Sequence, residues 1–285
     1  MHDDRPSATA AIVAAARGLA GVDPQAAELL PSRVAALVRV GQGPAGRALA
    51  WGLDAVGGGV VRHLALRTNA IDQALGQAVA SGIRQVVLLG TGLDSRPWRL
   101  QALRGTTVFE VDHPATAAWR QSKSARLGPA LAATRVDVVV DFARDDLRAR
   151  LTDAGLDPTL TSAWVWEGVT MYLPQAVTEQ SLDIIASLSA PGSWLCATYM
   201  VPLPGLPEPA RKALHAGFGA VGEPLIGLWP RAAFRAALQR HGFELLRDGN
   251  GKAWALGWDG GGRAPEPSWV FSPERLAVAL RRAAP

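Results

Sequence analysis

Short runs of consecutive apolar residues alternate along the chain with segments whose apolar positions recur every three to four residues. The run 86–89 is apolar and rich in β-branched residues, so it predicts a strand buried on both faces. Before it, Asn69 is placed to cap a helix in which Leu75 and Val79 share one face. The alternation then repeats and predicts strands at 107–112, 136–141, 163–167 and 194–199.

The connections between these strands are long enough to hold helices. Helices are predicted after Ser95, from Pro114, around Leu147 and at 175–188. Antiparallel pairing would need tight hairpin turns between the strands, and these connections are instead suited to right-handed helical crossovers. The pattern therefore predicts an α/β fold with a doubly wound, mostly parallel sheet.

The segments before and after these strands are predicted to be further parts of the same domain. We interpret 1–285 as a single domain, with a helical amino-terminal cover at 1–60 and a cofactor-binding core at 61–200. The proline-rich stretch 201–230 interrupts the alternation and is predicted to be a lid inserted after the fifth strand. Residues 231–285 would complete the sheet. They hold a helix, a strand at 243–247 and, after a glycine-rich loop, a run at 276–280 for which a strand is favoured over a helix.

Composition narrows the class of protein. The chain has 285 residues, of which 48% are hydrophobic, and this length can bury a large core without a disulfide or a metal. Cys196 is the only cysteine, and no clustered Cys/His pattern is present, so we expect no metal site and a cytoplasmic location. The acidic start of the chain does not resemble a signal peptide, and no apolar stretch is long enough to cross a membrane.

The net charge of +4 and the pI of about 9.8 raise the question of nucleic-acid binding. Only three of the 29 basic residues are lysines, and the arginines are scattered singly or in pairs among 25 acidic residues. A nucleic-acid site would gather its positive charge on one face, with aromatic side chains nearby. We therefore expect a small-molecule partner, and neither nucleic acid nor a membrane. A monomer and a homodimer are both compatible with the sequence.

The predicted carboxyl ends of the strands carry glycines and acids, and this is where open α/β sheets bind ligands. Gly90 and Gly92 follow the first strand, where bare backbone allows a ligand to approach closely. Asp112 ends the second strand and could bind ribose hydroxyls, although it could equally cap the helix that Pro114 begins. Asp141 and Glu167 end the next two strands. Together these positions favour a nucleoside ligand.

The residues after Gly92 help to choose the nucleoside. A dinucleotide site would have a third glycine where this chain has Ser95, and Asp94 would repel a pyrophosphate. S-adenosylmethionine has no phosphate and carries a sulfonium and an ammonium group, which an acid-lined pocket would favour. A nicotinamide-dependent oxidoreductase and a non-catalytic cofactor-binding module remain the alternatives.

Several segments give the chain a resemblance to a known family, the leucine carboxyl methyltransferase-like class I methyltransferases, which include many actinobacterial enzymes of secondary metabolism. The segments that carry it are ALRTNAID at 65–72, QVVLLGTGLDSR at 85–96, FEVDHP at 109–114, WEGVTMYLP at 166–174 and GEP at 222–224. The resemblance implies a Rossmann-like sheet of seven strands. It also implies transfer of a methyl group from S-adenosylmethionine.

The resemblance also implies a role for individual residues. Arg67 would clamp the carboxylate of the cofactor's methionine part, Gly90 would lie against that part, and Glu167 would face its amino-acid end. Asp112 would hold the ribose. Asp141 and Phe142 would hold the adenine, although relatives commonly have leucine where this chain has Phe142.

The expected reaction is O-methylation of a small molecule, with the carboxylate of a polyketide-like metabolite as the favoured acceptor. A phenolic hydroxyl and a protein C-terminal carboxylate are the other acceptors considered. A carboxylate is ionised at neutral pH and needs no general base, whereas a phenol would gain from one. His113, Tyr172 and Tyr199 are the candidate catalytic residues, because each lies at or just after the end of a predicted strand.

Overall fold

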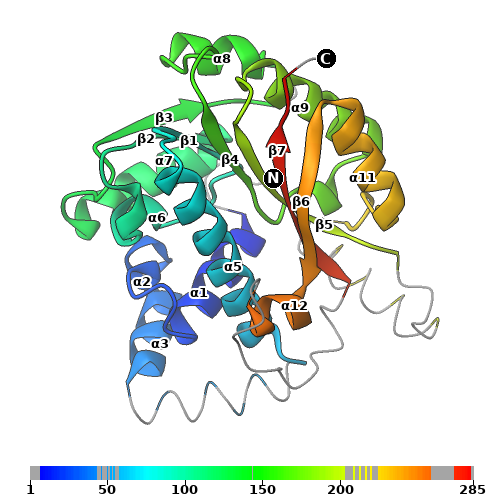
Figure 1. The fold of residues 1–285 in the computed structure, drawn as a ribbon. Helices are drawn as coiled ribbons and strands as arrows, with labels where there is room; N and C mark the ends of the chain where they lie inside the picture. Colours follow the sequence, from blue (N-terminus) through cyan, green and yellow to red (C-terminus); the bar gives the residue numbers. More distant parts are fainter. Residues whose placement is uncertain are drawn as a thin grey trace.

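A seven-stranded sheet forms the centre of the molecule and is covered by helices on both faces (Figure 1). The computed structural model describes residues 7–43, 58–142, 144–202, 224–257 and 273–283, with single positions between these ranges. The strands are β1 (Gln85–Leu89), β2 (Thr107–Asp112), β3 (Thr134–Val139), β4 (Ser162–Trp166), β5 (Trp194–Met200), β6 (Phe243–Asn250) and β7 (Glu274–Arg281). Their order across the sheet is β3-β2-β1-β4-β5-β7-β6.

The helices that the structure describes fall into an amino-terminal group and a group that packs on the sheet. They are α1 (Ala8–Leu19), α2 (Ala26–Leu29), α3 (Ser32–Gln42), α5 (Val60–Ala80), α6 (Arg96–Arg99), α7 (Pro114–Ser124), α8 (Leu147–Asp153), α9 (Gln175–Ser187), α11 (Arg231–Arg240) and α12 (Gly251–Leu256), with 3-10 turns η1 (Gln101–Leu103), η2 (Ala125–Leu127) and η3 (Thr170–Tyr172). None of the described helices is both long and apolar enough to cross a membrane.

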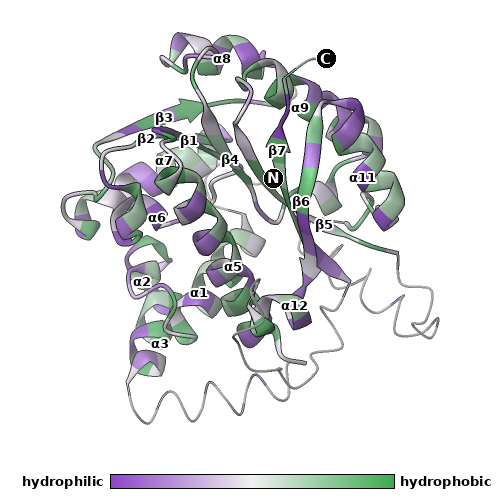
Figure 2. Cartoon of the chain, in the orientation of Figure 1, coloured by the Kyte–Doolittle hydropathy of each residue, from purple (hydrophilic) through white to green (hydrophobic). Residues whose placement is uncertain are grey.

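Successive side chains of each strand point to opposite faces of the sheet, so the apolar core has one part on each face. On one face, Val87 and Trp164 pack with side chains of α8, α9 and α11. On the other face, Val86, Leu88 and Val165 pack with α5 and α12. Because both faces are covered, the central strands β1 and β4 are buried at every position, and after their first residues, Gln85 and Ser162, they are entirely apolar. In Figure 2 these strands are largely green, whereas purple bands mark the outward faces of helices such as α11.

The last strand runs against the others. β7 lies between β5 and β6 and is antiparallel to both. Its first residue, Glu274, pairs with Met200 at the end of β5. An antiparallel strand therefore brings its amino-terminal end to the edge where the parallel strands have their carboxyl ends.

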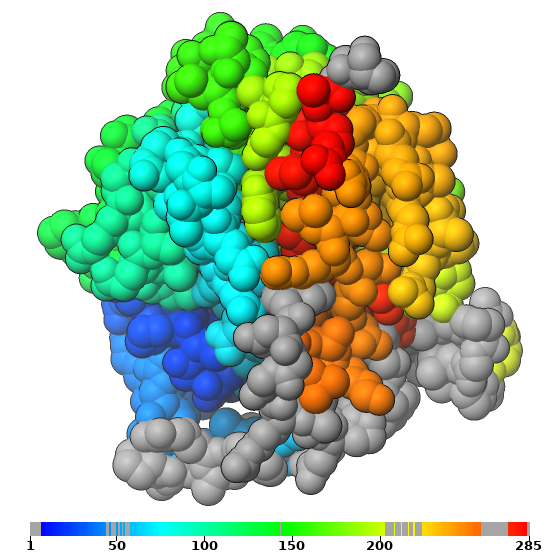
Figure 3. Space-filling model, in the orientation of Figure 1, coloured from blue at the N-terminus to red at the C-terminus, as the bar shows by residue number. Residues whose placement is uncertain are grey.

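The amino-terminal helices form a separate apolar cluster beside that edge. The blue segment in Figure 3 packs directly on the cyan and teal segments of the core. Helices α1 and α3 cross closely, because a side chain at Gly18 would meet Cγ1 of Val38 at 2.6 Å, and one at Gly41 would meet Leu19. The glycines at these two positions thus allow α1 and α3 to pack closely together.

Most predicted elements are present, with three differences. The helix predicted to begin at Asn69 begins at Val60, so Asn69 lies in its interior and caps nothing. Strand β3 ends at Val139, which leaves Asp141 in the following loop. The expected glycine-rich loop contains α12. The final apolar run is a strand, as favoured. Most of the predicted lid 201–230, including Gly222 and Glu223, lies outside the described residues.

Candidate functional site

A cavity of about 410 Å³ lies at the carboxyl ends of β1, β2 and β4. This volume falls within the range of about 300–1,000 Å³ that is typical of small-molecule sites. Its walls come from the segments after these three strands and after β3, from α5 and from α1. The lining residues are Ser7, Thr9, Ala10, Val13, Arg17, Arg67, Leu88, Leu89, Gly90, Thr91, Gly92, Leu93, Asp94, Asp112, His113, Thr116, Asp141, Phe142, Val165, Glu167, Gly168, Val169 and Tyr172.

The turn after β1 needs its two glycines. Gly90 and Gly92 have φ angles of 71° and 57°, in the region that other residues rarely adopt. A side chain on Gly90 would lie 2.8 Å from Cγ2 of Val169, and one on Gly92 would lie 3.2 Å from Cβ of Ala10 on α1. The turn is therefore enclosed between the segment that follows β4 and the amino-terminal helix α1, and its backbone forms one wall of the cavity.

Asp112 fixes the position of this turn. Its Oδ1 accepts a hydrogen bond from the backbone N–H of His113 at 2.7 Å, and its Oδ2 accepts one from the N–H of Gly92. Burial raises the pKa of Asp112, while Arg120 and the two N–H donors act in the opposite direction. The carboxylate thus joins the ends of β1 and β2 and also lines the cavity.

Glu167, at the end of β4, is held between two arginines. The Nε of Arg67 donates to its Oε1 at 2.9 Å, and Nη1 of Arg96 donates to its Oε2 at 2.8 Å. Burial raises the pKa of Glu167, but Arg96 and Arg67 outweigh that effect, and the pKa lies well below its usual range. Glu167 is therefore ionised, and its charge is already balanced by the protein.

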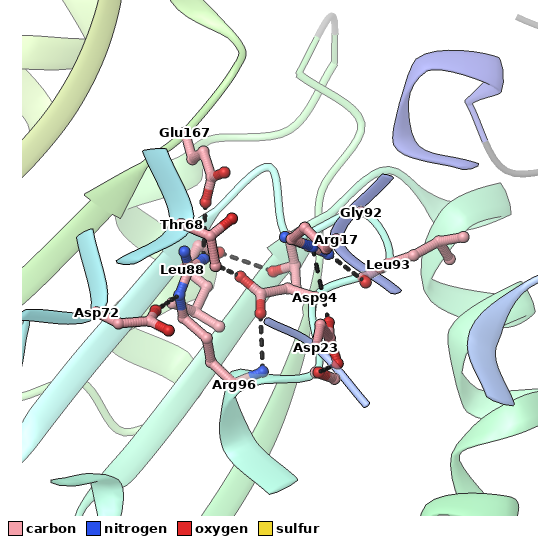
Figure 4. Close-up of polar contacts among 12 residues, drawn as sticks. Arg17, Asp23, Thr68, Asp72, Leu88, Gly92, Leu93, Asp94, Arg96 and Glu167 are labelled. Atoms are coloured by element: carbon pink, nitrogen blue, oxygen red, sulfur yellow. Dashed lines mark hydrogen bonds and ion pairs between the residues drawn. The ribbon is translucent and has the colours of Figure 1, made fainter. Parts of the chain in front are cut away.

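Asp94 is paired in a similar way. It accepts hydrogen bonds from the backbone N–H of Arg96 at 2.8 Å and from the Arg96 guanidinium. Burial raises its pKa, but Arg96 and Arg17 bring the pKa below the usual value. Arg17 lines the cavity and donates to the carbonyl of Leu93 at 2.7 Å (Figure 4). The expectation of an acid-lined pocket is thus wrong in one respect, because arginines neutralise these two carboxylates.

The structure brings together most of the residues predicted for the site. Arg67, Gly90, Gly92, Asp112, Asp141, Phe142, Glu167, His113 and Tyr172 all line the cavity. Tyr199 does not line it. Its ring stacks on Phe234 with centroids 4.1 Å apart, and its hydroxyl donates to Asp248 at 3.0 Å. Burial, with the nearby Asp248 charge, raises the pKa of Tyr199.

His113 has a structural role as well as a place in the cavity wall. It is the N-cap of α7, and its Nδ1 accepts a hydrogen bond from the N–H of Ala115. A neutral imidazole that accepts at Nδ1 carries its proton on Nε2. In this state Nε2 is a donor and has no lone pair to take a proton from an acceptor.

Several buried charged residues at or near the cavity are not among those predicted from the sequence. Arg17 breaks the apolar run of its helix, and this interruption was the available signal for a buried charge. Arg96 ends the segment QVVLLGTGLDSR and is fully buried. Glu274 and His63 are distant in sequence from the predicted carboxyl ends of the parallel strands, and both are buried next to Arg67.

Comparison with known proteins identifies the family. The sequence profile of the leucine carboxyl methyltransferases matches residues 8–186, which include α1, the glycine turn and the ends of β2 and β4. The chain belongs to this family. The resemblance inferred from the sequence segments is therefore confirmed.

Individual relatives agree with this assignment. A protein of Mycolicibacterium smegmatis that is assigned as an S-adenosyl-L-methionine-dependent methyltransferase is 44% identical over 138 residues, which are 48% of this chain and 46% of the relative. One of Mycobacterium avium with the same assignment is 42% identical over 155 residues, 54% of this chain and 49% of the relative. The chain thus spans about half the length of the curated relatives that it matches.

Solved structures confirm the predicted α/β fold. A protein from Thermobifida fusca, assigned as a methyltransferase, has a TM-score of 0.60 at 19% identity, with 98% of this chain and 96% of that chain covered. The two proteins therefore share the same α/β fold, which in this chain is built on a seven-stranded, mostly parallel sheet.

Proposed function

We propose that this chain binds S-adenosylmethionine in the cavity and transfers its methyl group to a small molecule. The observation that carries the proposal is the glycine turn held by Asp112 at the carboxyl ends of β1 and β2, inside a cavity of suitable size. Membership of the leucine carboxyl methyltransferase family supports the same function. When bound, the cofactor supplies a methyl group on a positively charged sulfur.

The residues present fit this cofactor better than a dinucleotide. A pyrophosphate would need the N–H groups at the start of the segment after the turn. Here the side chain of Asp94 already accepts the N–H of Arg96 at that point, and it carries a negative charge. The exposed Phe142 and the half-buried Asp141 follow β3, which neighbours β2 on the side away from β1, and they could hold an adenine. Arg67 could hold a carboxylate.

Calorimetry with S-adenosylhomocysteine and with NAD⁺ tests the cofactor. We expect the first to bind with a dissociation constant in the micromolar range or below, and the second to show no heat of binding at matched concentrations. Binding of NAD⁺ alone would favour the oxidoreductase alternative. Cofactor binding without methyl transfer to any acid or phenol in a panel would favour a non-catalytic module.

For the acceptor, we propose an oxygen that is already ionised, such as a carboxylate. A phenol or alcohol would need a nearby base to take its proton. Among the described residues that line the cavity, Glu167 and Asp94 are tied to arginines with lowered pKa values. Both oxygens of Asp112 accept backbone N–H groups, and His113 accepts at Nδ1.

The pH profile of methyl transfer checks this choice. A carboxylic acid has a pKa near 4, so kcat with a carboxylate acceptor should change by less than about twofold between pH 6 and 9. With a phenol, whose pKa is near 10, the rate should rise about tenfold per pH unit over the same range. A rising profile with the best acceptor in the panel would contradict the carboxylate proposal.

A further inference from the structure

The guanidinium of Arg67 is fixed by two carboxylates that come from distant parts of the chain. Its Nε donates to Glu167 at 2.9 Å, and its Nη1 donates to Oε1 of Glu274 at 2.8 Å. Arg67 and Glu274 are both buried, and Arg67 also lines the cavity. No hydrogen bond to Nη2 is present within the described ranges, and this nitrogen lies near the bare backbone of Gly168. Two of the three nitrogens are thus held by the protein, and the third is left for a ligand.

The antiparallel direction of β7 brings Glu274 to this place. Glu274 begins β7 and pairs in register with Met200 at the end of β5. It lies on the same face of the sheet as Leu276 and Val278, and this is the face that α5 covers. Since Arg67 is on α5, the first residue of β7 meets it directly at the cavity edge.

His63 holds the other oxygen of the same carboxylate. Its Nε2 donates to Oε2 of Glu274 at 2.6 Å, and it lies one helical turn before Arg67 on α5. Its ring packs against Trp254 of α12, with centroids 5.3 Å apart. Burial raises the pKa of Glu274, but Arg67 and His63 outweigh it and lower the pKa. Glu274 is therefore an ionised group with both oxygens engaged.

We propose that Glu274, held by His63, is a positioning residue that fixes the Arg67 guanidinium for the carboxylate of S-adenosylmethionine. The proposal rests on the proposed function. A fixed guanidinium binds a carboxylate more tightly, because less side-chain freedom is lost when the ligand arrives. A purely structural ion pair would instead stabilise the fold and have no selective effect on one end of the cofactor.

Binding of two ligands distinguishes a positioning role of Glu274 from a purely structural one. S-adenosylhomocysteine carries the amino-acid end, whereas 5′-methylthioadenosine has the same nucleoside and lacks that end. We expect Glu274→Gln to weaken binding of S-adenosylhomocysteine about tenfold, the effect of one charge-assisted hydrogen bond, and to change binding of 5′-methylthioadenosine by less than about twofold. Arg67→Met should show the same selectivity with a larger loss.

The matched control is Asp248→Asn, which removes a carboxylate from the same sheet outside the cavity lining. It should leave the affinity for both ligands unchanged, even if it lowers the melting temperature. Should Glu274→Gln fail to fold, Glu274→Asp carries the test, because it keeps the charge and withdraws it by one methylene group. We expect the same selectivity from it, at about a threefold loss.

A double substitution provides the decisive comparison. If Glu274 acts through Arg67, then Arg67→Met with Glu274→Gln should bind S-adenosylhomocysteine no more weakly than Arg67→Met alone. Additive losses, or equal weakening of both ligands, would overturn the positioning role. Failure of the unchanged protein to bind either ligand would instead refute the proposed function, so the two failures are distinguishable.

Discussion

Replacing Arg96 by methionine is expected to lower the free energy of unfolding by about 3–5 kcal/mol, the range seen when one partner of a buried ion pair is removed. Arg96 is fully buried and donates to Asp72, Asp94 and Glu167. Methionine would fill a similar volume, but it would leave three carboxylates without their shared cation. Urea denaturation followed by tryptophan fluorescence measures the change.

The control for this prediction is Arg240→Met. Arg240 also donates to a carboxylate, that of Glu179, but its side chain is 54% exposed. An exposed pair of this kind contributes at most about 1 kcal/mol. If the two variants lose similar stability, burial of the Arg96 cluster is not what makes it important.

Asp112→Asn should weaken binding of S-adenosylhomocysteine about 100-fold, although it changes a single atom. Both oxygens of Asp112 accept hydrogen bonds from backbone N–H groups, those of Gly92 and His113. An asparagine would have to turn its NH₂ group toward one of these donors. One end of the turn would then lose its support, and the ligand would lose a negatively charged partner.

Asp146→Asn is the matched control. Asp146 also accepts two backbone N–H groups, those of Arg148 and Ala149, but both reach the same oxygen, and the residue does not line the cavity. Asparagine can make these bonds and is an equally good N-cap. Calorimetry should therefore find unchanged affinity. A dissociation constant for Asp112→Asn within about threefold of the unchanged protein would contradict the role given to its two hydrogen bonds.

The fold was predictable because its central strands are largely apolar on both faces. The run 86–89 and the runs that follow it carry this pattern, and each is a strand in the structure. The start of α5 was not predictable in the same way. Its buried face carries His63 and Arg67, and these polar residues interrupt the apolar period that marks a helix.

The site was predictable only for residues at the carboxyl ends of parallel strands, where open α/β sheets bind their ligands. Gly90, Asp112 and Glu167 follow parallel strands, so inspection of the strand ends finds them. Glu274 could not be found in this way, because the direction of β7 cannot be inferred from an apolar run. The position of a carboxylate at a strand end also does not show which group it pairs with. Whether Glu167 faces a cationic ligand or an arginine depends on Arg67 and Arg96, whose packing is set by the tertiary structure.

The place of β7 between β5 and β6 has a consequence for synthesis on the ribosome. Strand β6 leaves the ribosome before β7, yet it has no direct neighbour in the sheet until β7 arrives. Throughout that interval the nascent chain exposes the unpaired edge of β5, which could pair with other polypeptides. We therefore expect the growing chain to depend on chaperones until residues 274–281 emerge.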